Sequence, residues 1–207
     1  MTNGVTGKID FNADIGESFA GYELGLDSEI VKYITSANIA TGFHAGDPDW
    51  MARTVALAVE NDVGIGAHPA YPDLAGFGRR NMDLTPAEVH NAVTYQIGAL
   101  AAFAPDRKLQ HVKPHGALYN TAVRDAAVAE AIVLAVQAFD PDLIHVVLAG
   151  SQWEAIARKH GVRVARECYA DRAVTPEGSL VPRSQPGAVV HDPETVVERS
   201  LKLATEG

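Results

Sequence analysis

Residues 9–17 read IDFNADIGE, a short strand in which polar side chains alternate with apolar ones. A dinucleotide-binding fold would place G-x-G-x-x-G directly after its first strand, and a P-loop would read G-x-x-x-x-G-K-S/T; the sequence has neither. Asp10, Asn12 and Asp14 share one face of this strand, and Glu17 follows just beyond it. Such a face is either a solvated edge or the floor of a polar cavity, and we favour the cavity.

Short apolar runs continue along the chain, and stretches with helical periodicity separate most of them, as is typical of βα units around a parallel sheet. The predicted strands are Lys8–Ala13, Asn38–Gly42, Val63–Ala67, His111–Lys113, Ile144–Ala149, Val162–Arg166 and Gly187–Val190. Capping residues and apolar spacing predict the helices Pro48–Asn61, Pro86–Phe103, Ala126–Phe139, Gln152–His160 and Pro193–Thr205.

Acidic residues, histidines and a lysine stand at the ends of nearly all these strands, which is how a β/α barrel builds a site at its carboxyl-terminal face. An open doubly wound sheet is the alternative. We therefore predict an α/β fold, a TIM-barrel-like (β/α)7 barrel that forms a single domain over residues 1–207.

The composition excludes several classes of protein. With 17 Lys+Arg against 26 Asp+Glu, a net charge of −9 opposes nucleic acid or an anionic membrane as the main partner. No run reaches the length of a membrane helix, and the lone Cys168 cannot form an internal disulfide. Because no basic and apolar leader occupies Met1–Asp10, we expect a cytoplasmic protein. The eight histidines are the unusual feature.

Three of those histidines occupy equivalent positions after predicted strands. His44 and His68 each follow an apolar strand, and His115 shares a strand face with Lys113. A single histidine of this kind is most often a satisfied, half-buried residue, but three together indicate chemistry. Imidazoles with a carboxylate suit Zn²⁺, although no H-E-x-x-H pattern is present, so a metal stays open. Its candidate ligands are His44, His68, His115 and Asp14.

Charged residues also gather after the sixth predicted strand, in ARECYADR at 165–172 and GSLVPRSQPG at 178–187. Arginine binds carboxylates or phosphates with two parallel hydrogen bonds, so Arg172 and Arg183 could receive an anionic substrate. Arg79 and Arg80 could do the same or pair with surface carboxylates. Strand alternation aims Cys168 away from Glu167, and we expect it in the helix layer as a small apolar residue.

Five motifs in order resemble the LamB/YcsF family from Lys8 to about Leu203: NADIGE, NIATGFHAGDP, GAHPAYPDLAGFGRR, VKPHGALYN and ECYADR with LVPRSQPGAVV. The resemblance implies a barrel-like fold related to the glycoside hydrolase/deacetylase fold. It also implies the role of the A subunit of a 5-oxoprolinase, which opens 5-oxoproline to L-glutamate with ATP and with separate B and C subunits in the cytoplasm.

The resemblance also selects the residues of the expected site except Asn12, which comes from the polar face of the first strand, and it does not fix their individual roles. We expect catalytic contributions from Asp14, Glu17, His44, His68, Lys113 and His115. We expect substrate contacts from Asn12, Asp47, Glu167, Asp171, Arg172 and Arg183. Because no P-loop is present, ATP binds either to this chain by another mode or to a partner protein. Family members continue beyond the last helix into a further strand with a Cys-x-His-Gly-Asp type motif, so we expect a barrel that lacks its last βα unit here.

Two other functions stay open at this stage. The fold also suits a stand-alone, metal-dependent amidohydrolase or deacetylase that acts on an N-acyl or carbohydrate substrate. The chain could equally be a non-catalytic subunit that binds substrate or holds its partners together. A homo-oligomer is compatible with either role.

Overall fold

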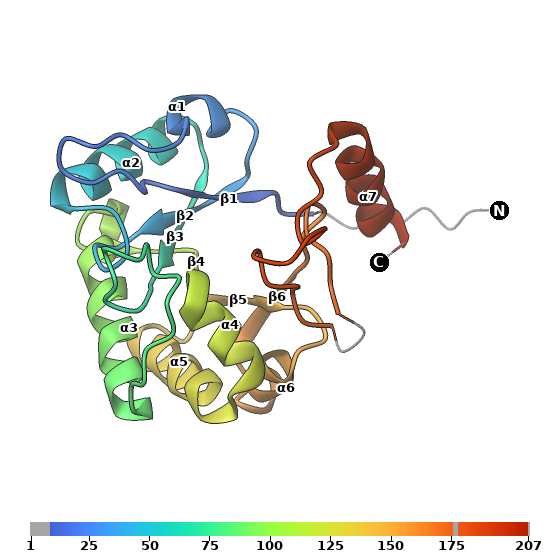
Figure 1. Ribbon diagram of the computed structural model, residues 1–207. Helices are drawn as coiled ribbons and strands as arrows, with labels where there is room; N and C mark the ends of the chain where they lie inside the picture. Colours follow the sequence, from blue (N-terminus) through green and yellow to red (C-terminus); the bar gives the residue numbers. More distant parts are fainter. Residues whose placement is uncertain (1–8, 176–177, 207) are drawn as a thin grey trace.

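The structure is a computed structural model that describes residues 9–175 and 178–206. Its centre is a parallel sheet in which six strands follow one another in chain order. The sheet curls into half a barrel, with α1 and α2 beside its first strands and α3, α5 and α6 along the rest (Figure 1). The strands are β1 (Asn12–Ile15), β2 (Ser36–Ala40), β3 (Gly64–His68), β4 (His111–Val112), β5 (Ile144–Leu148) and β6 (Arg163–Glu167).

This architecture confirms the α/β, TIM-barrel-like prediction with six strands instead of seven. The predicted strand Gly187–Val190 is wrong, because this segment makes only an isolated antiparallel bridge, Arg172 to Val189. It folds back on the chain that leaves β6 and does not join the sheet. The first strand begins later than predicted; Lys8 lies outside the described residues, and Asp10 precedes β1.

The predicted common face of the first strand is confirmed by its contacts. Asp10 accepts hydrogen bonds from the hydroxyls of Thr35 and Ser36, at 2.6 and 2.7 Å. Asn12 and Asp14 both contact the side chain of Asn38 on the neighbouring strand. The alternation of side chains along a strand therefore places these three polar residues together.

Capping side chains start the long helices where the sequence predicts them. Asp47 accepts from the backbone of Asp49 and Trp50, and Thr85 forms a capping box with Glu88. The helices behind the sheet are α2 (Pro48–Glu60), α3 (Pro86–Ala101), α5 (Ala126–Phe139) and α6 (Gln152–Lys159). They cover one continuous apolar core, in which Trp153, Ile97 and Ile132 are among the largest enclosed side chains.

Two helices and a 3-10 turn were not predicted. The helix α4 (Gly116–Arg124) follows β4 directly, and no side chain caps its first turn. It is fixed instead by burial of Ala117, Leu118, Tyr119 and Ala122. The short helix α1 (Asp27–Ile30) and the 3-10 turn η1 (Pro105–Arg107) lie between larger elements.

The last helix, α7 (Pro193–Glu206), stands apart from the sheet in Figure 1. None of its described side chains is buried. Its Arg199 donates from Nη2 to the backbone oxygen of Arg172 at 2.8 Å, which ties the helix to the segment after β6. None of the described helices has both the length and the apolar character needed to cross a bilayer.

His145 on β5 makes the stability of the fold depend on pH. Its side chain is enclosed, and its Nδ1 has no hydrogen-bond partner among the described residues. Burial lowers the pKa of His145 to about 4, whereas the pKa of histidine in an unfolded chain is about 6.5. The unfolded chain therefore takes up a proton first as the pH falls. The stabilisation from burying the neutral ring is complete above pH of about 6.5 and is lost toward pH of about 4.

Urea unfolding of the wild type and of His145→Gln across this range measures that contribution. Between pH of about 6.5 and pH of about 4, the free energy of unfolding of the wild type should fall by about 3 kcal/mol relative to that of the variant. A difference between the two proteins that stays constant with pH would contradict the argument.

Candidate active site

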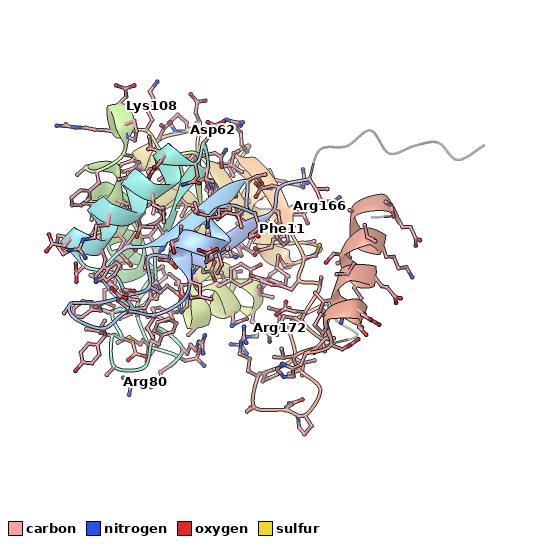
Figure 2. The ribbon with its side chains drawn as sticks, turned by 90° about the horizontal axis from the view of Figure 1, so that it is seen from above. Phe11, Asp62, Arg80, Lys108, Arg166 and Arg172 are labelled. Atoms are coloured by element: carbon pink, nitrogen blue, oxygen red, sulfur yellow. The ribbon has the colours of Figure 1, made fainter. Side chains whose placement is uncertain are left out.

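A cavity of about 360 Å³ opens at the carboxyl ends of the strands. Asp14, His68, Lys113 and His115 reach it from the ends of β1, β3 and β4. Tyr169 and Arg172 reach it from the chain that leaves β6, and Figure 2 shows Arg172 where that chain meets the body of the molecule. The rim carries three more arginines, Arg79, Arg124 and Arg183.

An amide network supports Asp14, which lines this cavity. Asn38 donates from Nδ2 to Asn12 Oδ1 at 2.7 Å and to Asp14 Oδ1 at 2.9 Å. Its own Oδ1 accepts from His111 Nε2 at 2.8 Å. Burial lowers the pKa of His111 to about 4, so the ring is neutral and serves as a donor here. The polar face of the first strand therefore reaches the cavity at Asp14, whereas Asp10, at the exposed start of that face, lies outside the cavity lining.

Lys113, which directly follows β4, joins the two strands β1 and β6 through its ammonium group. Its Nζ lies 2.7 Å from Glu167 Oε1 on β6, and 3.2 and 3.0 Å from Asp14 Oδ1 and Asn12 Oδ1 on β1. Tyr169 donates to the other oxygen of Glu167 at 2.6 Å. Burial opposes the charge of Lys113, but Asp14 and Glu167 outweigh it and raise its pKa. The buried ammonium therefore stays charged and holds Asp14 in place.

Backbone carbonyls orient two histidines of the site. His68 donates from Nδ1 to the oxygen of Lys113 at 2.6 Å, and His115 donates from Nε2 to the oxygen of Phe77 at 2.9 Å. A carbonyl only accepts, so these ring nitrogens carry the protons. The remaining nitrogens, His68 Nε2 and His115 Nδ1, face one another at 2.9 Å. His44 stacks on His115, with ring centroids 3.9 Å apart and planes 6° from parallel.

Two carboxylates border the histidines. Glu17 Oε1 lies 3.1 Å from His44 Nε2 and 3.4 Å from His115 Nδ1, and Asp14 Oδ2 lies 3.4 Å from His68 Nε2. Burial raises the pKa of Asp14, but His68 and Lys113 outweigh it and hold that pKa well below its usual value. Burial raises the pKa of Glu17. The two carboxyl groups therefore differ in acidity, and Asp14, the more acidic of them, lines the cavity.

The same physical causes give the three imidazoles different charges. Burial lowers the pKa of His44 well below its usual value and that of His115 to about 3, so both rings are neutral. Burial acts in the same direction on His68, but the carboxylate of Asp14 overcomes it and raises the pKa of that ring. Positive charge in the cluster is thus concentrated beside Asp14.

A tight turn at Phe77 and Gly78 shapes the cluster. Both residues have a positive φ, 54° and 61°, which is rare for a phenylalanine. The turn aims the Phe77 carbonyl at His115 and places the Phe77 ring edge-on to His44 and His115. Backbone strain of this kind concentrates at functional sites, where the surrounding structure holds it.

The structure brings most of the expected residues together, with two exceptions. Asp47 is the N-cap of α2, and its other oxygen accepts from Ala20 at 2.7 Å, so it does not line the cavity. Asp171 does not line it either; its backbone oxygen accepts from Val190. Arg80 pairs with Asp73, whereas Arg79 reaches the cavity. The expectation for Cys168 is wrong, because this residue is exposed and not in the helix layer.

Sequence reasoning missed several residues that build the site. Asn38 had a signal, since it is an amide among the small and apolar residues of β2. Tyr119 sits on the unpredicted α4, and Tyr169 contacts Glu167 only because the chain turns after β6. The turn at Phe77 and Gly78 carries no signal beyond its glycines.

These features define a barrel-like α/β protein with a histidine and carboxylate site at the ends of its strands. The chain belongs to the LamB/YcsF family, whose model matches residues 9–207. It is 57% identical over 202 residues to the A subunit of the 5-oxoprolinase from Pyrococcus furiosus, and the match covers 97% of this chain and 79% of that protein. It is 56% identical to the A subunit of the 5-oxoprolinase from Syntrophobacter fumaroxidans, with 97% and 80% covered.

A solved structure supports the same assignment. The crystal structure of the lactam utilization protein from Thermus thermophilus matches with a TM-score of 0.89 at 51% identity. The match covers 95% of this chain and 80% of the other.

Proposed function

We propose that this chain is the A subunit of a cytoplasmic, ATP-dependent 5-oxoprolinase, which opens the lactam of 5-oxo-L-proline to L-glutamate together with separate B and C subunits. One observation carries the proposal beyond the names of the relatives. An ionised Asp14, held by Lys113, faces an arginine-lined cavity beside the His68 and His115 pair. This combination suits attack of water on a carbonyl carbon in a substrate that also bears a carboxylate.

The chemistry explains why both ATP and such a site are needed. A five-membered lactam is a poor electrophile, and its hydrolysis is unfavourable enough to require coupling. In the proposed scheme the carbonyl oxygen receives the γ-phosphoryl group of ATP, and Asp14 directs water onto the activated carbon. The C–N bond then breaks and the ring nitrogen leaves with a proton. One water opens the ring and a second is consumed in releasing phosphate.

The positive groups of the site have separate tasks in this scheme. Lys113 and the His68 and His115 pair lie next to Asp14, where they stabilise negative charge that develops on the substrate. Arg172 donates from Nε and Nη2 to the backbone oxygens of Ala188 and Val181, so its guanidinium is fixed in the cavity wall. We assign the carboxylate of 5-oxoproline to Arg172 with Arg183 or Arg79 at the rim.

The test is the formation of glutamate and ADP by the purified chain, alone and with B and C subunits. We expect both products only when all subunits, 5-oxoproline and ATP are present. Asp14→Asn should lower turnover by about 100- to 1,000-fold, because the group that directs water is lost while its size is kept. Asp10→Asn is the matched control: this carboxylate shares the face of Asp14, contacts Thr35 and Ser36, and lies outside the cavity lining.

Three results would overturn the proposal. Hydrolysis by the chain alone without ATP would favour the amidohydrolase. Full turnover by Asp14→Asn within the complex would favour a subunit that only binds substrate or holds its partners. No glutamate from the complete set of subunits would exclude 5-oxoproline as the substrate.

A further inference from the structure

The contact between His68 and His115 needs a third atom. A neutral imidazole carries a single N–H proton. His68 donates this proton to the backbone oxygen of Lys113, and His115 donates it to the backbone oxygen of Phe77. When both rings are neutral, the two nitrogens that face one another at 2.9 Å therefore both present lone pairs. Two lone pairs at that distance repel, so either a shared proton or a cation must lie against them.

The surroundings of these nitrogens favour a cation with more than one charge. Glu17 Oε1 lies 3.4 Å from His115 Nδ1, and Asp14 Oδ2 lies 3.4 Å from His68 Nε2. One ring nitrogen from each of His44, His68 and His115 and one oxygen of Glu17 all lie within 4.8 Å of one another. Ligands at zinc distances of about 2.0–2.1 Å around a tetrahedral ion are separated by about 3.3 Å, close to the spacings seen here.

Ring orientation distinguishes ligands from supporting residues. The planes of His68 and His115 are 85° apart, so one ion can lie in both planes. His44 is stacked nearly parallel to His115, and an ion in the plane of His115 lies outside the plane of His44. His44 instead contacts Glu17 through Nε2 at 3.1 Å. The neutral His44 ring donates this hydrogen bond and so orients the carboxylate of Glu17. Hydrogen bonds on the far side of each ligand are the usual support of a metal site.

We propose that His68 Nε2, His115 Nδ1 and a carboxylate oxygen of Glu17 hold one divalent transition-metal ion of the zinc type, with a coordination position open toward the cavity. The mixture of imidazole and carboxylate ligands suits Zn²⁺, Co²⁺ or Fe²⁺ more than Mg²⁺ or Ca²⁺. The site deepens the proposed function, on which its catalytic meaning rests. An ion there would polarise a carbonyl oxygen or lower the pKa of a bound water.

Metal binding can be measured without turnover. The full chain, with any affinity tag removed and metal stripped by a chelator, is titrated with Zn²⁺ against a chromophoric competitor and with Co²⁺ by its visible absorption. We expect one ion per chain and a cobalt spectrum of low coordination number. His115→Ala should weaken binding by about 100-fold or more, since it removes a ligand. Glu17→Gln keeps the size of the side chain and should weaken binding by about 10-fold.

His160→Ala is the matched control, because His160 also pairs with a glutamate, Glu130, at 2.9 Å, but outside the cluster. It should bind zinc as the wild type does. Absence of stoichiometric binding to the wild type, or equal affinity in both cluster variants and the wild type, overturns the site. Circular dichroism and thermal unfolding of each variant identify any loss of fold.

The two proposals fail in different ways. A chain that binds one zinc ion but gives no glutamate with its partner subunits contradicts the function and leaves the metal site intact. A wild-type chain that forms glutamate with its partner subunits but shows no stoichiometric binding of Zn²⁺ or Co²⁺ contradicts the metal site and leaves the function intact.

Discussion

Replacing Lys113 by methionine is expected to lower 5-oxoproline turnover by about 100- to 1,000-fold and to destabilise the fold by about 3–5 kcal/mol. The ammonium group is the partner of Glu167 at 2.7 Å and of Asp14 at 3.2 Å, and the side chains of Lys113 and Glu167 are each only 5% exposed. Methionine fills a similar volume but leaves a buried carboxylate without its cation. Steady-state assays of the complex and urea unfolding of the isolated chain measure the two effects.

A second substitution separates the two effects. In Lys113→Met/Glu167→Gln the unpaired buried charge is gone, so much of the stability should return, while turnover should stay low because Asp14 is still unsupported. Lys32→Met is the control for loss of a lysine ion pair. Lys32 pairs with Glu29 at the surface, and its loss should change stability by less than about 1 kcal/mol. If the double variant is no more stable than Lys113→Met, the charge argument is wrong.

Gly78→Ala is expected to remove nearly all turnover and to destabilise the protein by about 2–5 kcal/mol. A Cβ atom at this position would lie 2.8 Å from His44 Cβ and 2.9 Å from His115 Cδ2. Both atoms belong to stacked, enclosed side chains that cannot withdraw, so the histidine cluster must shift. The φ of 61° adds a backbone cost for any residue with a side chain.

Gly150→Ala separates this clash from the backbone cost. Gly150 has a similar φ of 75°, but a Cβ there meets no described atom within 4 Å. We expect Gly150→Ala to cost about 1–2 kcal/mol and to keep turnover. Equal losses of stability and activity in the two variants would show that backbone strain alone, and not crowding of the histidines, accounts for the effect of Gly78→Ala.

The sequence was enough to predict where the parallel strands end and which of the site residues stand at those ends. Alternation alone placed Asn12 and Asp14 on one face, and the strand ends selected His44, His68, His115 and Lys113, because parallel strands deliver their carboxyl ends to one edge of a sheet.

What the sequence could not supply is the geometry of loops. Asp47 precedes a proline at the start of a helix. An aspartate at such a position can cap the helix or belong to the site, and in the structure it caps α2. Arg172 was predicted to bind an anion. The hydrogen bonds that fix its side chain go to Ala188, in the segment predicted as a seventh strand, and to Val181, in the loop before that segment. The tautomers of His68 and His115 depend on carbonyl positions that no local pattern encodes.

The position of Lys113 also links the dynamics of the sheet to its chemistry. The strands β1 and β6 are the two ends of the sheet, and each has a neighbour on one side only among the described strands. One ammonium group holds Asp14 at the first end and Glu167 at the last. Local opening of either edge strand would therefore dismantle the reaction centre before the core unfolds. Solvent exchange of the β1 and β6 amides then reports directly on the fraction of molecules that are competent to react.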